Sequence, residues 1–350
     1  MNKIIIEDAT TIAETIDINW QYLKNKTVLI AGANGYVPQF FVHGLLRRNE
    51  LYNDNITVIA MCRNEDKAKE RFGEYYGRND FHLLLQDVSN KLNYDGQIDF
   101  IIHAASPAGI KLTMDNPLNV FKANITGCDN LLSIAMSKKA RFLYISSVDI
   151  YGNMSEAKRM QEDDIGTLNH LSLRNVYASS KRMAETLCVS YGQAGVDSVI
   201  VRPSQVIGPG VSLDDERLHI NMVSQVLSGN KIILKGDGTP KRTFIYVTDA
   251  VAGMLAVLTK GKSGEAYNIC TEECEATVRE LAEVIAGLVK GRRIEVTYNM
   301  ETRVSDPAVK EVVSMVCTSS QKLQRLGWTA HVSLADACKR MMDYYGVEVN

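Results

Sequence analysis

The stretch that decides the fold is KTVLIAGANGYVPQFFVHGLLRR, residues 26–48. The apolar run Val28–Ala31 predicts a strand, and Gly32-Ala33-Asn34-Gly35 separates it from a segment of helical period. Glycines at such a junction let backbone amides approach a pyrophosphate, and the helix N-terminus adds partial positive charge. Pro38 stands where a third glycine is usual, which a first helical turn tolerates. The stretch therefore predicts a dinucleotide-binding turn with cofactor contacts from Gly32, Asn34, Gly35, Tyr36 and Val37.

Further apolar runs alternate with mostly helical segments along the next 150 residues. They lie at Ile56–Cys62, His82–Leu85, Phe100–Ala105, Phe142–Ser146 and Val199–Val201. Strands that alternate with helices imply right-handed crossovers and a parallel sheet. We therefore expect an α/β protein with a Rossmann doubly wound parallel sheet and a smaller, mixed α/β C-terminal lobe. The expected regions are a helical extension (1–25), a cofactor domain (26–202) and a substrate lobe (203–350), with chain crossings between the lobes.

Composition excludes several classes of protein. The chain has 350 residues, of which 45% are hydrophobic and 23% charged, and its net charge is −2, so no basic surplus indicates a nucleic-acid binder. The seven cysteines are an odd, scattered set that favours reduced thiols, and Cys270 and Cys274 lack the spacing and partners of a metal site. The N-terminus lacks the apolar region of a signal peptide, and no run is long enough to span a bilayer. We expect a cytoplasmic protein without a metal or a membrane partner.

The ends of the second and third expected strands bear on the choice of cofactor. An acid usually ends the second strand and binds the adenosine ribose, but here the sequence is Met61-Cys62-Arg63. Arg63 is suited to the 2′-phosphate of NADP or to stacking on adenine, and it is equally compatible with a solvated arginine. Asp87, followed by Val88, is placed to contact the adenine amine or to cap the next turn.

Tyr177 and Lys181 are four residues apart and so lie on one face of a helix. A free tyrosine has a pKa near 10, so only about 0.1% is ionised at neutral pH, and a nearby cation favours the phenolate. Such a tyrosine accepts a proton from a substrate hydroxyl as hydride leaves the same carbon. Ser147 follows the fifth apolar run, at the sheet edge where ligands bind in open α/β folds.

Together these motifs resemble the extended short-chain dehydrogenase/reductase family, in its NAD-dependent nucleotide-sugar epimerase/dehydratase branch. The resemblance rests on GANGYVP, HAAS (103–106), KANITG, SSVDIYG, YASSK, RPSQVIGPG and GDGTPKRTFIYVTDA, and it covers about residues 26–346. It implies Tyr177 as the base, Lys181 as the group that lowers its pKa and binds the nicotinamide ribose, and Ser147 as the third member of a triad. It also implies that NAD is held by Ala104, Ala105, Ser106, Asn124, Arg202 and Pro203, and a nucleotide-diphosphate sugar by Ser106, Ser147, Ser204 and Arg242. A homodimer through the helices after the fourth and fifth strands is implied as well.

The residues after Ser147 bear on the reaction. In the family's 4,6-dehydratases an Asp-Glu pair supplies acid and base where this chain has Val148 and Asp149. The family's UDP-glucuronate decarboxylases have a neutral residue and then Glu, and their HxASPA loop is similar to residues 103–108. Oxidation at C4 followed by elimination, of the dehydratase or decarboxylase kind, is therefore favoured, with Asp149 as a catalytic residue. An epimerase is the alternative; an NADPH-dependent reductase and a non-catalytic dinucleotide-binding protein stay open.

Overall fold

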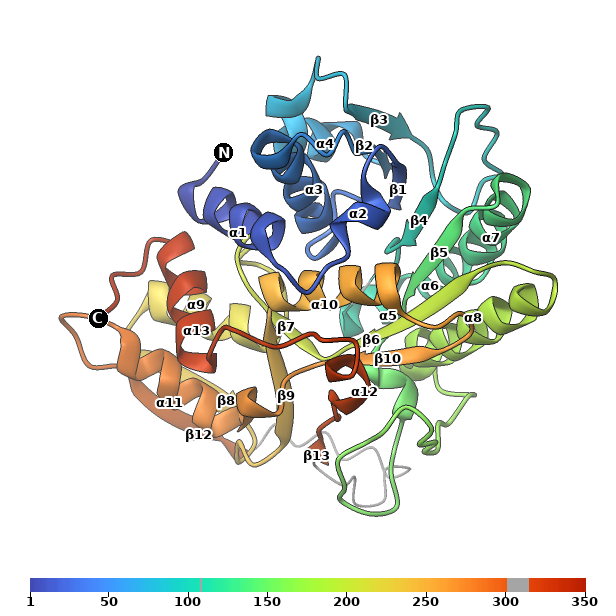
Figure 1. Ribbon diagram of the computed structural model, residues 1–350. Coiled ribbons are helices and arrows are strands. Elements are labelled where there is room, and N and C mark those ends of the chain that lie inside the picture. Colours follow the sequence, from blue (N-terminus) through green and yellow to red (C-terminus); the bar gives the residue numbers. More distant parts are fainter. Residues whose placement is uncertain (108, 301–314) are drawn as a thin grey trace.

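Seven parallel strands form the central sheet of this computed structural model, which describes residues 1–107, 109–300 and 315–350 (Figure 1). Their order across the sheet is β10-β6-β5-β4-β1-β2-β3. The strands are β1 (Thr27–Ala31), β2 (Thr57–Cys62), β3 (Phe81–Leu85), β4 (Phe100–His103), β5 (Arg141–Ile145), β6 (Ser198–Pro203) and β10 (Ala266–Ile269). Six of them lie within a residue or two of the expected runs, and only β10 had no counterpart in the sequence analysis. The doubly wound parallel sheet is confirmed.

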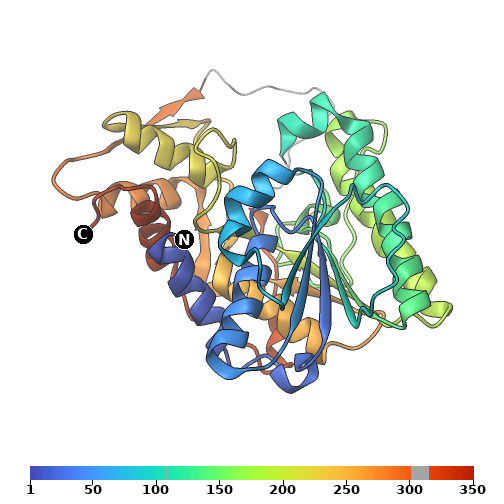
Figure 2. The same ribbon diagram turned by 90° about the horizontal axis from the view of Figure 1, so that it is seen from above.

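Helices cover both faces of this sheet, because successive strand residues point to opposite faces. Val28 and Ile30 of β1 pack with one layer of helices, and Leu29 and Ala31 pack with the other. Figure 2 shows the blue helices on one side of the sheet and the green helices on the other. The first layer contains α3 (Pro38–Tyr52), α4 (Glu65–Phe72) and α10 (Val247–Lys260). The second layer contains α7 (Thr126–Lys138) and α8 (Val176–Gln193). Helix α6 (Pro117–Asn124) packs on both α7 and α8, and α5 (Ile110–Asp115) lies beside α6.

The N-terminal extension packs against two parts of the protein. It contains α1 (Lys3–Glu14) and the single turn α2 (Trp20–Leu23). Helix α1 packs on α3, where a Cβ on Gly44 would lie only 2.6 Å from Cγ2 of Ile12. It also packs beside α13 (Leu334–Tyr344), at the opposite end of the chain, through ion pairs to Arg340 (Figure 1). The extension therefore touches both the cofactor domain and the C-terminal lobe.

The C-terminal lobe is built from short strands and four helices in the described part of the chain. Strand β9 (Lys241–Tyr246) pairs with β7 (Gln205–Ile207), β11 (Glu275–Thr277) and β13 (Met315–Val316), and β8 (Lys231–Lys235) pairs with β12 (Glu295–Asn299). The helices are α9 (Leu218–Ser228), α11 (Val278–Leu288), α12 (Gln321–Gln324) and α13. Thr277 caps α11 in a reciprocal pair with Glu280. The boundary between lobes near residue 203 stays a prediction, because β10 and α10 follow it in the chain yet pack with the first domain.

Candidate active site

The turn after β1 requires glycine at position 32. Gly32 has a φ of +77°, and a Cβ there would lie 2.6 Å from the Cα of Ala105, in the loop after β4. Only glycine combines this backbone conformation with so close an approach. Helix α3 then begins at Pro38, so the proline occupies a first-turn position. The two loops thus meet over the carboxyl edge of the sheet, where open α/β folds bind their ligands.

A cavity of about 380 Å³ opens at this edge, between the loops that follow β1 to β4. Nine of the predicted cofactor residues line it: Gly32, Asn34, Gly35, Arg63, Asp87, Val88, Ala104, Ala105 and Ser106. The other seven predicted residues do not line it: Tyr36, Val37, Asn124, Tyr177, Lys181, Arg202 and Pro203. The Tyr36 hydroxyl donates to the carbonyl of Val206 at 3.4 Å, and Val37 packs against the core. A glycine-lined recess of this shape fits the dinucleotide that the sequence predicts.

Arg63 and Asp87 lie next to one another in the lining of the cavity. Nη1 of Arg63 lies 3.8 Å from Oδ2 of Asp87, and both side chains are exposed or half-buried. Burial raises the pKa of Asp87, but hydrogen bonds from Ser89 and the charge of Arg63 bring it below its ordinary value. A carboxylate beside Arg63 repels a 2′-phosphate, so this pair favours NAD over NADP.

Lys181 lies in the middle of α8 with its ammonium buried under the sheet edge. Nζ donates to the carbonyl of Ile145 at 2.7 Å and lies 4.8 Å from the ring centroid of Tyr144 and 5.6 Å from that of Tyr177. Burial lowers the pKa of Lys181 to about 7. The pKa of Tyr177, by contrast, is raised well above its ordinary value by burial and by the charge of Asp149. The hydrogen bond from Ser147 and the charge of Arg217 lower it, but by less. The lowering that we expected from Lys181 therefore depends on further positive charge at the site.

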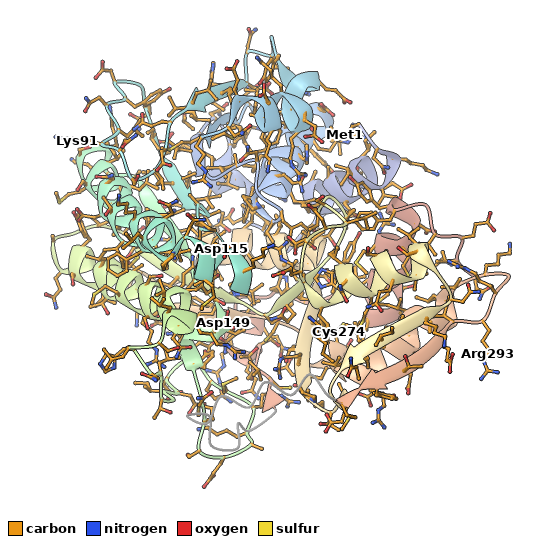
Figure 3. All side chains as sticks on the ribbon, turned by 180° about the vertical axis from the view of Figure 1, so that it is seen from behind. Met1, Lys91, Asp115, Asp149, Cys274 and Arg293 are labelled. Carbon is orange, nitrogen blue, oxygen red and sulfur yellow. The ribbon has the colours of Figure 1, made fainter. Side chains whose placement is uncertain are left out.

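Ser147 and Asp149 follow β5 directly and enter the same site. Ser147 precedes the turn η2 (Val148–Tyr151), accepts a hydrogen bond from the Asp149 amide at 3.1 Å, and bonds the side chains of Asp149 and Tyr177. Asp149 is exposed as a residue, but protein surrounds its carboxyl closely enough to raise the pKa of that group. The hydrogen bond from Ser147 and the charge of Arg242 lower this pKa by less than burial raises it. Figure 3 shows Asp149 between the green elements of the cofactor domain and the yellow and red elements of the C-terminal lobe. A desolvated carboxyl that a substrate can still reach is suited to proton transfer.

The remaining predicted residues surround this cluster. Asn124 is buried and donates to the Ser180 hydroxyl at 2.9 Å, and that hydroxyl donates to the carbonyl of Tyr177 at 2.8 Å. Helix α6 is thereby tied to α8 directly behind the tyrosine. Ser106 bonds the carbonyl of Pro107, and Ala108 of the same loop lies outside the described residues. Arg242, half-buried on β9, donates to the carbonyl of Lys241.

Arg202, Pro203 and Ser204 lie at the end of β6. The guanidinium of Arg202 is held by both carboxylate oxygens of Glu185, at 3.0 and 2.8 Å, and also donates to the Tyr151 hydroxyl and the Glu162 carbonyl. These bonds account for its burial, and its predicted contact with the cofactor stays a prediction. Pro203 ends the strand, and the buried Ser204 hydroxyl has no hydrogen-bond partner among the described residues.

Sequence reasoning missed two residues close to the tyrosine. The guanidinium of Arg217 stacks 5.1 Å from the ring centroid of Tyr36, and its charge acts on Tyr177. Tyr144 on β5 places its ring beside the Lys181 ammonium. No motif marks either position, because each acts through a contact between segments that are distant in the chain.

Other site types are not found in the described part of the chain. All seven cysteines are buried and free, and residues 1–107, 109–300 and 315–350 contain no group of three or more side chains placed to hold a metal ion. No helix among these residues is long and apolar enough to cross a membrane.

The strand order and the glycine turn that opens toward the cavity define a dinucleotide-binding protein of the Rossmann class. On α8, Tyr177 and Lys181 lie one helical turn apart, with the lysine Nζ 5.6 Å from the tyrosine ring centroid, an arrangement that is suited to acid-base chemistry. The sequence profile of the NAD dependent epimerase/dehydratase family matches residues 28–270, so the chain belongs to this family. The family resemblance, the enzymatic nature of the chain and NAD as its cofactor are thereby confirmed.

Two similar proteins are UDP-glucuronic acid decarboxylases. The chain is 29% identical over 327 residues to UDP-glucuronic acid decarboxylase 3 of Arabidopsis thaliana, covering 93% of this chain and 91% of the relative. UDP-glucuronic acid decarboxylase 1 of Danio rerio is also 29% identical over 327 residues, 93% of this chain and 73% of the relative.

Solved structures share the fold. The epimerase Mth375 of Methanothermobacter thermautotrophicus superposes with a TM-score of 0.79 at 20% identity, covering 98% of this chain and 96% of that one. A dTDP-glucose 4,6-dehydratase of Bacillus anthracis, solved with NAD, has a TM-score of 0.74 at 20% identity, covering 92% and 96%.

Proposed function

We propose that this enzyme oxidises C4 of a nucleoside-diphosphate uronic acid, such as UDP-glucuronate, and then removes the sugar carboxyl as carbon dioxide. The observation that carries the proposal is Asp149, a single reachable carboxyl of raised pKa beside Ser147 and Tyr177. Its neighbour Val148 is apolar and buried where the dehydratase pattern has an acid. A turn with Asp149 and with Val148 in place of the dehydratase acid suits loss of carbon dioxide better than loss of water. The 29% identity to UDP-glucuronic acid decarboxylases points the same way.

The first step removes hydrogen from C4 of the sugar. Bound NAD supplies the hydride acceptor for this step and the donor for the last. Tyr177 takes the proton of the C4 hydroxyl, and Ser147 orients the same oxygen by a hydrogen bond. Lys181 is fixed by its bond to Ile145 and contributes positive charge next to the phenol while it is protonated, at pH values below its pKa of about 7.

The second step breaks the bond between C5 and the carboxyl carbon. A ketone at C4 makes the sugar a β-keto acid, so the electron pair of that bond moves to the C4 oxygen as an enolate and carbon dioxide leaves. Asp149 in its protonated form then delivers a proton to C5, and the C4 ketone is reduced to complete the cycle. The raised pKa of Asp149 favours this form and avoids repulsion between two carboxylates.

The substrate's negative charge is matched by Arg242 on the C-terminal lobe. Arg242 is half-buried, and burial lowers its pKa while Asp149 opposes that effect, so the guanidinium faces the same space as the carboxyl. Its fork of donors suits phosphate oxygens, and we assign the diphosphate to it. The exposed cofactor-side cation, Arg63, is paired with Asp87 and is left out of substrate binding.

The test is product analysis on several nucleotide sugars. Incubation with UDP-glucuronate, UDP-glucose, UDP-GlcNAc and dTDP-glucose distinguishes loss of carbon dioxide, loss of water and an unchanged mass with altered sugar NMR. We expect carbon dioxide from the uronic acid. An unchanged mass would replace the decarboxylase by an epimerase, and stoichiometric consumption of added NADPH would replace it by a reductase.

Tyr177→Phe identifies the catalytic tyrosine. The variant should still bind the nucleotide sugar but lose turnover by about 100-fold or more, the usual contribution of a positioned acid or base. Tyr191→Phe is the matched control, because Tyr191 lies on the same helix and bonds Asp129 and Ser133 away from the site. Normal turnover by Tyr177→Phe would refute the assignment.

The proposal includes a cytoplasmic homodimer that acts in carbohydrate biosynthesis. Exposed apolar side chains gather on the helices after the fourth and fifth strands of the first domain, namely Leu118 and Phe121 on α6, Met136 on α7, and Met183 and Val189 on α8. A second copy covering this face would remove them from water. Light scattering should give twice the chain mass, and Met183→Glu should give the monomer. Seven free, buried thiols support a reducing compartment.

A further inference from the structure

Arg182 follows Lys181 on α8 and spans two segments of the loop that presents Asp149. Its Nε donates to the carbonyl of Ile150 at 2.6 Å. Its Nη2 donates to the carbonyl of Gly166 at 2.8 Å and to that of Tyr151 at 3.3 Å. One guanidinium therefore holds three backbone carbonyls, two of them in the turn η2 that carries Asp149.

The two segments that Arg182 joins, around Tyr151 and around Gly166, are packed too closely to move independently of one another. Gly152 has a φ of +66°, and a Cβ there would lie 2.4 Å from the carbonyl oxygen of Thr167. The Gly166 amide donates to the carbonyl of Tyr151 at 3.0 Å. The planar fork of an arginine can bind carbonyls of both segments at once, whereas a lysine offers a single charged point.

The opposite side of the same turn is held through Tyr151. Its hydroxyl donates to Asn268 at 2.7 Å and accepts from Arg202 at 3.0 Å. The side chain of Tyr151 is thus anchored to β6 and β10, and the backbone of the turn is anchored to α8 by Arg182. Asp149 directly precedes these anchored residues, and its own amide donates to the Ser147 hydroxyl at 3.1 Å.

We infer that Arg182 is the positioning residue for proton transfer by Asp149. The inference rests on the proposed function and deepens it. Helix α8 then serves both halves of the cycle: Tyr177 and Lys181 act in the oxidation at C4, and Arg182 fixes the carboxyl that acts at C5. A positioning residue of this kind affects the second step more than the first, because it touches neither the cofactor cavity nor the tyrosine.

The experiment separates the two steps in Arg182→Lys and Arg182→Met. Reduced cofactor is followed by its absorbance at 340 nm after UDP-glucuronate is mixed with the enzyme, and carbon dioxide and nucleotide-sugar products are measured over the same time. In both variants we expect reduced cofactor to accumulate and the 4-keto sugar to be released. Formation of the finished product should fall about 100-fold, as expected for a displacement near 1 Å, while KM changes by less than about threefold.

Arg141→Lys is the matched control. Arg141 is also a partly buried arginine that binds a carboxylate, Asp197, and a backbone carbonyl, that of Gly261, but it begins β5 at the opposite end of the sheet from Asp149. Its lysine variant should lower the melting temperature without accumulation of reduced cofactor. Arg182→Lys keeps the charge, so it serves as the test if Arg182→Met fails to fold.

Each outcome decides the inference. A parent enzyme that releases no carbon dioxide overturns the proposed function and this inference with it. A parent that does so, with Arg182 variants whose two steps match those of Arg141→Lys, overturns the inference alone. An equal fall of both steps also overturns it, because Arg182 would then support the whole site. Accumulated reduced cofactor confined to the Arg182 variants supports it.

Discussion

Asp8 gives the protein a pH-dependent stability that can be measured directly. The carboxyl lies on α1, is buried, accepts a hydrogen bond from Tyr246 at 2.8 Å, and pairs with Arg340 of α13 at 2.8 Å. Burial raises its pKa from an ordinary 3.8 to about 6, with a small contribution from Glu7, even though Arg340 and Tyr246 lower it. The same contact raises the pKa of the more exposed Arg340, which stays charged throughout.

The size of the effect follows from proton linkage. Each pH unit between the pKa of the unfolded chain and that of the folded protein is worth about 1.4 kcal/mol, so Asp8 contributes about 3 kcal/mol. The folded state binds this proton more tightly than the unfolded chain does. The contribution is therefore complete below pH 3.8, declines as pH rises, and is lost above pH 6.

The assay compares the parent with Asp8→Asn by urea denaturation at several pH values. From pH 4 to pH 7.5 the parent should lose about 2.4 kcal/mol of unfolding free energy relative to the variant, which cannot titrate at this position. This is less than the full effect because the unfolded carboxyl is already partly ionised at pH 4. Glu7→Gln is the control, because Glu7 binds the same arginine from a half-buried position. This variant keeps Asp8, so its unfolding free energy should fall with pH as that of the parent does. A difference between parent and Asp8→Asn that is constant within about 0.5 kcal/mol over this range would refute the reasoning.

Three further changes test the fold and the site. Gly32→Val should destabilise the protein by about 2 to 5 kcal/mol and abolish NAD retention, because residue 32 has a positive φ and the new side chain would meet the backbone of Ala105. Urea denaturation measures the stability, and the cofactor content of the purified protein measures NAD retention. Gly44→Val should cost about 1 to 3 kcal/mol by overpacking Ile12 while leaving NAD bound. Lys181→Met should abolish turnover. Measured without cofactor, its unfolding free energy relative to that of the parent should be greater at pH 6 than at pH 9. The reason is that the folded parent releases the lysine proton near pH 7, while the unfolded chain holds it to about pH 10.5.

Contrary results would be equally informative. Retained NAD in Gly32→Val would show that the turn does not hold the cofactor. Gly192→Ala is the control for both glycine changes, because no atom outside its chain neighbours and the backbone of its own helix lies within 4 Å of the new Cβ. It should not destabilise the protein, since alanine is favoured over glycine inside a helix. A pH-independent difference for Lys181→Met would mean that the folded parent keeps this proton as tightly as the unfolded chain does.

Much of the fold could be predicted because its signals are local. The alternation of apolar runs and helices is visible within short windows, and Gly32 and Pro38 mark a strand-to-helix turn by their backbone properties alone. Strand β10 could not be assigned in this way. Its four residues join the sheet only through their pairing with β6, more than 60 positions earlier in the chain.

Part of the candidate site could likewise be predicted from local signals in the sequence, and part could not. Tyr177 and Lys181 share one helix, so their spacing alone places them together. The electrostatics of the site could not be anticipated from spacing, since the burial of Lys181 and the influence of Asp149 on Tyr177 arise from the packing of separate segments. Arg182 is adjacent to a motif residue, yet its three carbonyl partners are visible only in the folded chain.

The late position of β10 has a consequence for synthesis on the ribosome. Strand β6 is made by residue 203, but the neighbour that covers its free edge is not complete until residue 269 has left the exit tunnel. During that interval the nascent sheet presents an unpaired edge, which is prone to association with other chains. Slow passage through residues 204–265 would prolong this exposure, so codon choice in that segment should influence how much of the newly made chain stays unaggregated.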